Sequence, residues 1–129
     1  MRVLLDTNVF LWSIAGETSR LSARAAGVIR DETNELLLSA ASLWEIALKV
    51  RAGKLDLPER WEFFHEHMTA LGIRSVLPIE ARHVFGLFQL PEYHRDPFDR
   101  LLVSQCQAER LPLVASDRAL RRYPIEVLW

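Results

Sequence analysis

Five short apolar runs, separated by segments with helical periodicity, most strongly constrain the fold of this 129-residue chain. Apolar runs of this length are typical of buried strands. Strands that alternate with helices favour a parallel sheet, because each helix carries the chain back across a face of the sheet. The sequence therefore predicts an α/β fold in which helices cover both faces of a parallel sheet. The expected strands span residues 2–5, 35–39, 73–77, 113–115 and 125–129.

Six segments between these runs are expected to be helical. In the third segment, Leu43, Ile46 and Val50 recur at the spacing that places side chains on one face of a helix. Gly53 and Gly72 are expected to end the third and fourth helices, since glycine readily adopts the backbone conformation found just after a helix. The expected helices run from a cap at Thr7 or Asn8 to residue 15, then over residues 22–31, 41–52, 59–71, 80–88 and 97–109, with a short helical turn near residue 119.

Composition and charge are those of an ordinary globular protein. The net charge is −1, so charge alone predicts no nucleic-acid partner. The single cysteine, Cys106, cannot form a disulfide or a zinc cluster within one chain, which fits a reducing cytoplasm. No apolar stretch approaches the ~20 residues of a membrane span, and Asp6 interrupts the N-terminal apolar region too early for a signal peptide. Without repeats or linkers, residues 1–129 are expected to form one cytoplasmic domain.

Two acids directly follow predicted strands. Asp6 stands at the carboxyl end of the first strand, and Asp117 follows the fourth strand in the segment LVASD. Either acid alone is explained by a turn or a helix cap. In parallel α/β sheets, however, ligands bind outside the carboxyl ends of the strands. The two acids together therefore indicate a functional site at that edge.

The segment HRDPFDRLLVSQ contributes two more acids. Asp96 precedes Pro97 and is expected to cap the last long helix, rather than to act as a ligand. Asp99 falls inside the apolar arc of the same helix, where a carboxylate needs a partner. Its alternative role is a favourable interaction of an acid with the first helical turn, worth ~0.3–1 kcal/mol. The residues alone leave these two roles of Asp99 equally open.

Glu45 and the histidines receive structural interpretations from their positions. Glu45 lies off the apolar face of its helix and precedes Lys49 by four residues, which predicts an exposed ion pair worth ~0.2–0.5 kcal/mol. His83 and His94 are expected to be surface or structural residues. His65 and His67 point to different faces of a helix, and the chain contains no HExxH zinc motif.

Convergence of Asp6, Asp99 and Asp117 would create a site for a hard divalent cation. Carboxylates a few ångströms apart repel one another, and Mg²⁺ bound by their oxygens removes this repulsion. Because the sequence suggests no histidine or cysteine in the set, zinc is disfavoured. A metal held this way can activate water for attack on a phosphodiester. Several basic residues nearby could neutralise a nucleic-acid backbone or could simply be solvated: Lys49, Arg51, Lys54, Arg95 and Arg100.

Four segments of the chain, in order, resemble the motifs of PIN-domain proteins, and in particular the VapC-type toxins of toxin–antitoxin pairs. These segments are DTNVFLW, SLWEIALK, HRDPFDRLLVSQ and LVASDRAL. The resemblance implies a three-layer α/β/α fold with a mostly parallel central sheet of about five strands, formed by one PIN domain over residues 1–129. It also implies an endoribonuclease that depends on Mg²⁺ or Mn²⁺.

The resemblance also assigns site residues. The acids that match the family pattern are Asp6, Glu45, Asp99 and Asp117. For Glu45 this overrules the helix-face argument. Asn8 matches the asparagine of the DTN motif and is expected to support a ligand carboxylate or a metal-bound water. Many members carry threonine two positions before the last acid, where this chain has Ala115; the hydroxyl of Ser116 comes one position later.

The family further implies an RNA substrate, a homodimer and a small antitoxin whose tail covers the acidic pocket. Alternatives on the same fold are a nuclease of RNA processing and a non-catalytic domain that binds RNA or another partner. A receiver-like phosphoacceptor is disfavoured, because Asp6 is followed by Thr7 rather than by a second acid, and no lysine follows Lys54.

Overall fold

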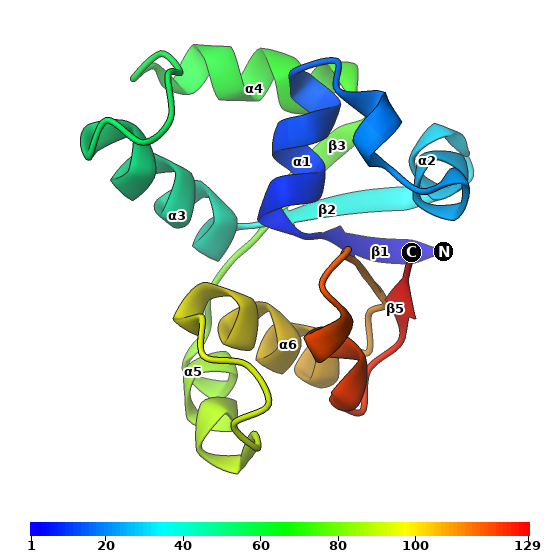
Figure 1. The fold of residues 1–129 in the computed structure, drawn as a ribbon, viewed down its shortest axis with the longest axis vertical. Coiled ribbons are helices and arrows are strands. Elements are labelled where there is room, and N and C mark those ends of the chain that lie inside the picture. Colours follow the sequence, from blue (N-terminus) through cyan, green and yellow to red (C-terminus); the bar gives the residue numbers. More distant parts are fainter.

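A computed structural model describes residues Met1–Trp129 and contains one five-stranded sheet with all neighbouring strands parallel. The strand order is β3-β2-β1-β4-β5, so the first strand lies at the centre (Figure 1). The first three strands have the predicted bounds, whereas the last two are shorter than predicted. The strands are β1 (Arg2–Leu5), β2 (Glu35–Ser39), β3 (Ile73–Leu77), β4 (Leu113–Val114) and β5 (Val127–Leu128).

Six α-helices connect and cover the strands. They are α1 (Thr7–Ile14), α2 (Ala23–Arg30), α3 (Ala40–Arg51), α4 (Trp61–Ala70), α5 (Ala81–Gly86) and α6 (Pro97–Glu109). Three short 3₁₀ segments span Thr18–Arg20, Leu87–Gln89 and Arg118–Arg122. The predicted helix over residues 80–88 is thus an α-helix only to Gly86. The predicted cap of α1 at Thr7 or Asn8 is wrong, because Asp6 occupies the N-cap position.

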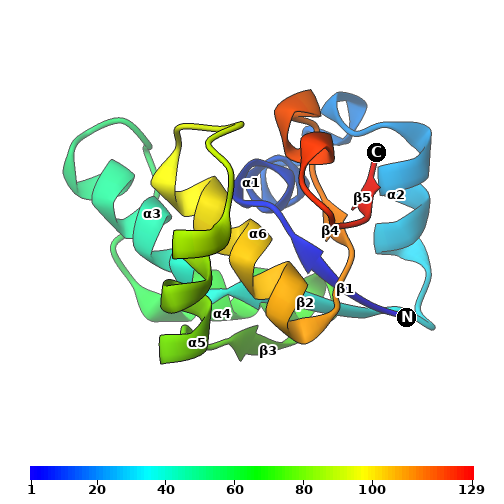
Figure 2. The same cartoon turned by 90° about the horizontal axis from the view of Figure 1, so that it is seen from below.

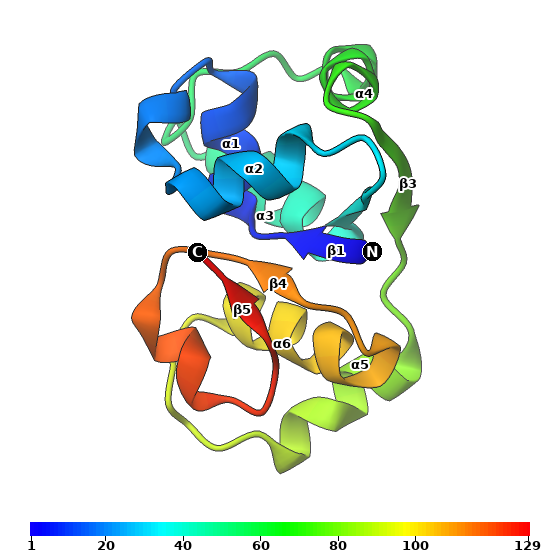
Figure 3. The same cartoon turned by 90° about the vertical axis from the view of Figure 1, so that its right-hand side faces the viewer.

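Alternating side chains of the strands divide the interior into two cores. Leu4 and Leu37 point to one face of the sheet and pack with α6, while Val3 and Leu5 point to the other face and pack with α1. Successive side chains of a strand point to opposite faces, so a strand buried on both sides reads as a continuous apolar run. Figure 3 shows α1, α2 and α4 on one side of the sheet and α5 and α6 on the other. The predicted three-layer α/β/α architecture is therefore confirmed.

Glycines end α3 and α4 as predicted. Gly53 follows α3 with φ of 74°, and Gly72 follows α4 with φ of 83°. These positive angles strain any residue with a Cβ, which explains glycine at both helix ends. No helix of the structure is both long and apolar enough to cross a lipid bilayer.

The carboxyl ends of the central strands meet beside three helices. Leu5 of β1 is in register with Val114 of β4, and the backbone N–H of Asp6 donates to the Val114 carbonyl at 3.0 Å. Helix α3 leaves the end of β2 and contacts both α1 and α6. Figure 2 shows α1, α3 and α6 at the end of the sheet toward which β1 runs. The topology thus brings residues from distant parts of the sequence to one edge.

Candidate functional site

Asp6 lies where β1 passes into α1, and it is buried. Only 6% of the residue is exposed. Burial, together with the nearby charges of Asp99 and Glu45, raises the pKa of Asp6 to about 7, against the opposing effect of the backbone N–H groups of Thr7 and Asn8. A carboxylate in this position is therefore unfavourable without a positively charged partner.

Asp96 and Asp99 begin α6 and have different roles. The side chain of Asp96 accepts hydrogen bonds from the backbone N–H groups of Phe98 at 2.8 Å and Asp99 at 3.1 Å, which confirms it as the helix cap. Asp99 is half-buried, and its pKa is raised to about 6 by burial and by the charge of Asp96, while His94 acts in the opposite direction. The charges of Glu45 and Asp117 raise it further.

Asp117 is the most exposed of the acids, with 47% of its side chain accessible. Its side chain caps the 3₁₀ segment after β4 by accepting from the Ala119 N–H at 2.9 Å. Its second carboxylate oxygen accepts from Nε2 of His94 at 2.7 Å. Although partial burial acts to raise the pKa of Asp117, the Ala119 N–H and His94 lower it below its usual value. Asp117 therefore stays ionised, whereas the pKa values of Asp6 and Asp99 are raised.

Glu45 is buried, which corrects the prediction of an exposed residue. Its ion pair with Lys49 exists at 2.8 Å, yet only 7% of the Glu45 side chain is accessible. The helix-face argument failed because α3 contacts both α1 and α6, so it has a second buried face that apolar spacing alone does not indicate. One carboxylate oxygen of Glu45, Oε1, is buried and has no hydrogen-bond partner.

His94 also joins the site, although the sequence placed no histidine there. Its Nε2 lies 2.7 Å from Oδ2 of Asp117 and 3.3 Å from Oδ2 of Asp99. The ligand-type atoms of these three residues all lie within 4.8 Å of one another. Because His94 comes from a loop without periodicity, its side-chain direction could not be inferred from spacing. The only available signal was its closeness in sequence to the DPFD segment.

The donor set fits a hard divalent cation. The charges of Asp99 and Glu45 raise the pKa of Asp6, and the charges of Glu45 and Asp117 raise the pKa of Asp99. A set of carboxylate oxygens that repel one another, one of them buried without a partner, is what Mg²⁺ or Mn²⁺ would complete. Charge interactions thus link Asp99 with Asp6, Glu45 and Asp117, and the convergence of Asp6, Asp99 and Asp117 on one cation stays a prediction.

The predicted supporting residues occupy the margin of this site. Asn8 is exposed and Ser116 is half-buried, and neither side chain makes a hydrogen bond within the protein. Ala115 is buried and packs in the core next to α6. Alanine therefore stands where many family members have threonine, at a buried position where a hydroxyl group would need a hydrogen-bond partner.

The basic residues proposed for RNA contacts differ in their partners. Arg51 pairs with Glu59 at 3.1 Å. Arg100 donates to backbone carbonyl groups of the loop before α6, including that of Pro91 at 3.0 Å. Arg95 is exposed and forms no ion pair. Lys49 holds Glu45, as described above.

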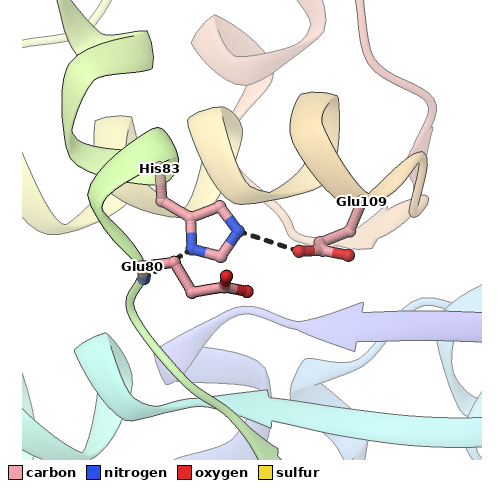
Figure 4. Close-up of side chains that lie close together, drawn as sticks. All are labelled: Glu80, His83 and Glu109. Carbon is pink, nitrogen blue, oxygen red and sulfur yellow. Dashed lines mark hydrogen bonds and ion pairs between the residues drawn. The ribbon is translucent and has the colours of Figure 1, made fainter.

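A second histidine–acid cluster links α5 to α6 (Figure 4). His83 is fully buried; its Nδ1 accepts from the Glu80 backbone N–H at 2.9 Å, and its Nε2 lies 2.9 Å from Glu109. Arg82 pairs with both Glu80 and Glu109. Every member has a protein partner of opposite polarity, so this cluster is structural, as the sequence predicted for His83.

Solved structures with the same fold cover essentially the whole chain. VapBC2 from Rickettsia felis, solved bound to a promoter DNA fragment, aligns over 100% of both chains with a TM-score of 0.68 and 18% identity. FitAcB from Neisseria gonorrhoeae aligns over 98% of this chain and 96% of its own, with a TM-score of 0.59 and 19% identity. At such identities these likenesses establish the fold alone.

Sequence comparison adds a curated relative and a family. Over 44 residues the chain is 50% identical to Ribonuclease VapC16 of Mycobacterium tuberculosis H37Rv, and this match spans 31% of each protein. The family model for the PIN domain matches residues 3–126, which include all four acids of the site. The chain therefore belongs to the PIN-domain family.

Proposed function

We propose that this protein is a metal-dependent endoribonuclease of the VapC type. The observation that carries the proposal is the charge interaction that links Asp6, Glu45, Asp99 and Asp117, together with one buried Glu45 oxygen that lacks a partner. The PIN-domain membership and the likeness to a relative named as a ribonuclease support the same activity.

Asp6, Asp99 and Asp117 are the residues that would hold Mg²⁺ or Mn²⁺, with Glu45 beside them. When bound, the cation supplies a Lewis acid at the phosphodiester and a water of lowered pKa. Burial of Asp6 makes its ionised form depend on positive charge, which favours cation binding. Lys49 neutralises one oxygen of Glu45 and leaves Oε1 free.

RNA would approach from the exposed side of the site, where Asp117 is accessible to solvent. Arg95 is the basic residue best suited to a backbone phosphate, since it is exposed and unpaired. Lys49, Arg51 and Arg100 remain candidates for such contacts, although each has a partner within the protein. Asn8 and Ser116, at the margin, have side chains free to hydrogen-bond a water or the RNA.

The toxin role and its partners are part of the proposal. The structural relatives are a VapBC2 assembly and a FitAcB assembly. We infer that this chain is likewise the toxin of a toxin–antitoxin pair, forms a homodimer, and acts on RNA in the cytoplasm. A basic side chain of a cognate antitoxin that enters the acidic site would inhibit by charge pairing.

The activity is tested with purified protein, freed of any partner, and a mixed set of structured and single-stranded RNAs. We expect cleavage with Mg²⁺ or Mn²⁺ and none with EDTA. Because a metal contributes several kcal/mol of transition-state stabilisation, we expect Asp99→Asn to lose roughly 100-fold or more of the rate. Glu62→Gln, an exposed acid on α4, is the matched control and should cleave normally.

Three other results would change the conclusion. Cleavage that persists in Asp99→Asn would remove that residue from the site. Absence of both cleavage and metal binding in the wild type would favour a non-catalytic domain that binds RNA or another partner. Cleavage restricted to a precursor RNA would instead favour a nuclease of RNA processing.

A further inference from the structure

His94 connects three parts of the acidic site. It lies in the loop before α6, and 15% of its side chain is accessible. Its Nε2 is 2.7 Å from Oδ2 of Asp117 and 3.3 Å from Oδ2 of Asp99. Its other ring nitrogen, Nδ1, accepts from the backbone N–H of Asp96 at 3.0 Å. One imidazole thus contacts the helix cap and two acids of the site.

The contact with Asp96 fixes which nitrogen of His94 carries the proton. A backbone N–H can only donate, so Nδ1 must be the unprotonated, accepting nitrogen. In a neutral imidazole the proton then resides on Nε2. This N–H group points at the carboxylate of Asp117, which makes His94 a hydrogen-bond donor to the acids.

The same proton prevents His94 from binding a metal through Nε2. A ligand nitrogen must offer a lone pair, and the lone pair of His94 is directed at Asp96. Ligation through Nε2 would require the proton to move to Nδ1, where it would face the Asp96 N–H with no acceptor. Closeness to the acids therefore does not make His94 a fourth ligand.

Asp117 is the acid that depends most on this contact. Nearly half of its side chain is exposed, and its protein partners are the Ala119 N–H and His94. By contrast, Asp6 is enclosed by the core. A fixed donor from the loop before α6 is what holds the Asp117 carboxylate toward Asp99, which begins that helix.

We propose, resting on the function proposed above, that His94 is a positioning residue that holds Asp117 beside Asp99 and does not itself ligate the metal. Donors that orient metal-binding side chains are commonly worth roughly 10–100-fold in metal affinity or activity. A change at His94 should therefore weaken metal binding and catalysis without altering the contacts of the protein with RNA.

The proton position is measured in the wild-type protein by long-range ¹H–¹⁵N correlation spectra of the histidine rings. The spectra are recorded at mildly alkaline pH, where a free imidazole is neutral, and His94→Gln assigns the His94 signals. We expect the Nε2–H form both without metal and with saturating Mg²⁺. A transfer of the proton to Nδ1 on addition of Mg²⁺ would show that His94 is a ligand and would overturn the proposal.

Three substitutions separate the donor from the loop contact. His94→Gln offers an N–H donor near the position of Nε2, His94→Asn offers an acceptor near the position of Nδ1, and His94→Leu offers neither. We expect metal affinity, measured calorimetrically with Mg²⁺ and Mn²⁺, to fall roughly 10–100-fold in the Asn and Leu variants. The Gln variant should retain most of it. His65→Gln, on α4, is the matched control.

The outcomes distinguish this proposal from the underlying function. Restoration by Asn rather than by Gln would assign His94 a role in loop structure alone, and equal affinity in all variants would give it no role. In RNA cleavage we expect kcat to fall while KM is unchanged; a rise in KM alone would instead place His94 at the RNA. If the wild type binds no metal and cuts no RNA, the proposed function itself fails.

Discussion

At the scale of single residues, two acids of the site oppose the stability of the folded protein when no cation is bound. Asp6 and Asp99 both have raised pKa values, which means that burial and mutual repulsion disfavour their ionised forms. Asp117, in contrast, has a lowered pKa because N–H donors hold its carboxylate. The site thus combines two acids that lack sufficient partners with one that is already stabilised, and a cation would act on the first two.

The raised pKa of Asp6 predicts a pH dependence of stability. Asp6 titrates near 3.8 in the unfolded chain and near 7 in the folded protein. Between these values the folded protein binds more protons, so its free energy of unfolding falls as pH rises, and the full loss is present above pH 7. In EDTA, we expect a rise in pH from about 5 to about 8 to lower the melting temperature of the wild type more than that of Asp6→Asn.

Expressed as free energy of unfolding, the loss caused by Asp6 should be on the order of a few kcal/mol at most, since each pKa unit corresponds to about 1.4 kcal/mol. Asp56→Asn is the control, because Asp56 is exposed and its charge is not among those that raise the pKa of Asp6 or Asp99. We expect its pH dependence to match that of the wild type. Parallel curves for the wild type and Asp6→Asn would contradict the raised pKa.

Individual site residues differed in how well the sequence predicted them. Asp6 and Asp117 follow apolar runs, so the parallel sheet alone places them at the same edge. Glu45 needed the family resemblance, because its burial depends on how α3 packs between two other helices. His94 was missed, because a loop gives no periodicity from which a side-chain direction follows. Position along an element can be predicted from sequence, whereas contacts between elements cannot.

At the scale of elements, α5 and α6 pack more closely than any residue with a Cβ would allow at Gly86. A Cβ at that position would collide with the side chain of Ser104. Ser104 cannot easily move away, since its hydroxyl donates to the His83 carbonyl at 2.5 Å. The buried His83 cluster fixes the same pair of helices.

This contact predicts that Gly86→Ala destabilises the protein. Overpacking of a tight contact typically costs about 1–3 kcal/mol, which should appear as a lower midpoint in urea unfolding. Gly27→Ala in α2 is the matched control, because a Cβ there meets open space. Alanine in a helix should stabilise by about 0.5–1 kcal/mol. Equal effects of the two substitutions would contradict the tight packing at Gly86.

The sequence predicted the bounds of a strand or helix correctly where nearby residues, such as an apolar run or a terminal glycine, determine them. Strands β1, β2 and β3 match their apolar runs, and Gly53 and Gly72 end their helices. Strands β4 and β5 are shorter than their apolar runs, because their pairing extends over only two residues in each strand. Ladder length depends on the neighbouring strand, which an apolar run does not reveal.

At the scale of the whole molecule, the site joins elements from the beginning, middle and end of the sequence. Asp6 lies in the first β–α junction, Glu45 on α3, Asp99 on α6, and Asp117 after β4. A ligand of all these acids would bind only the folded protein. Binding of such a ligand would therefore stabilise the arrangement of these elements in addition to their packing.

This arrangement predicts that Mg²⁺ or Mn²⁺ raises the melting temperature. A ligand that binds only the folded state stabilises by about 2.7 kcal/mol at a concentration 100 times its Kd. We expect this shift in the wild type and in Asp56→Asn, its loss in Asp99→Asn, and its reversal by EDTA. An unchanged melting curve of the wild type at saturating metal would contradict a metal site.

The central position of β1 has a consequence for synthesis on the ribosome. Strand β1 is made first, yet its partner β4 and the acid Asp117 are made after almost all of the remaining chain. A nascent chain that already carries Asp6, Glu45 and Asp99 still lacks the ladder that joins Asp6 to Val114. If the protein is the ribonuclease proposed above, this order of synthesis would delay assembly of its site until translation of the chain is nearly finished.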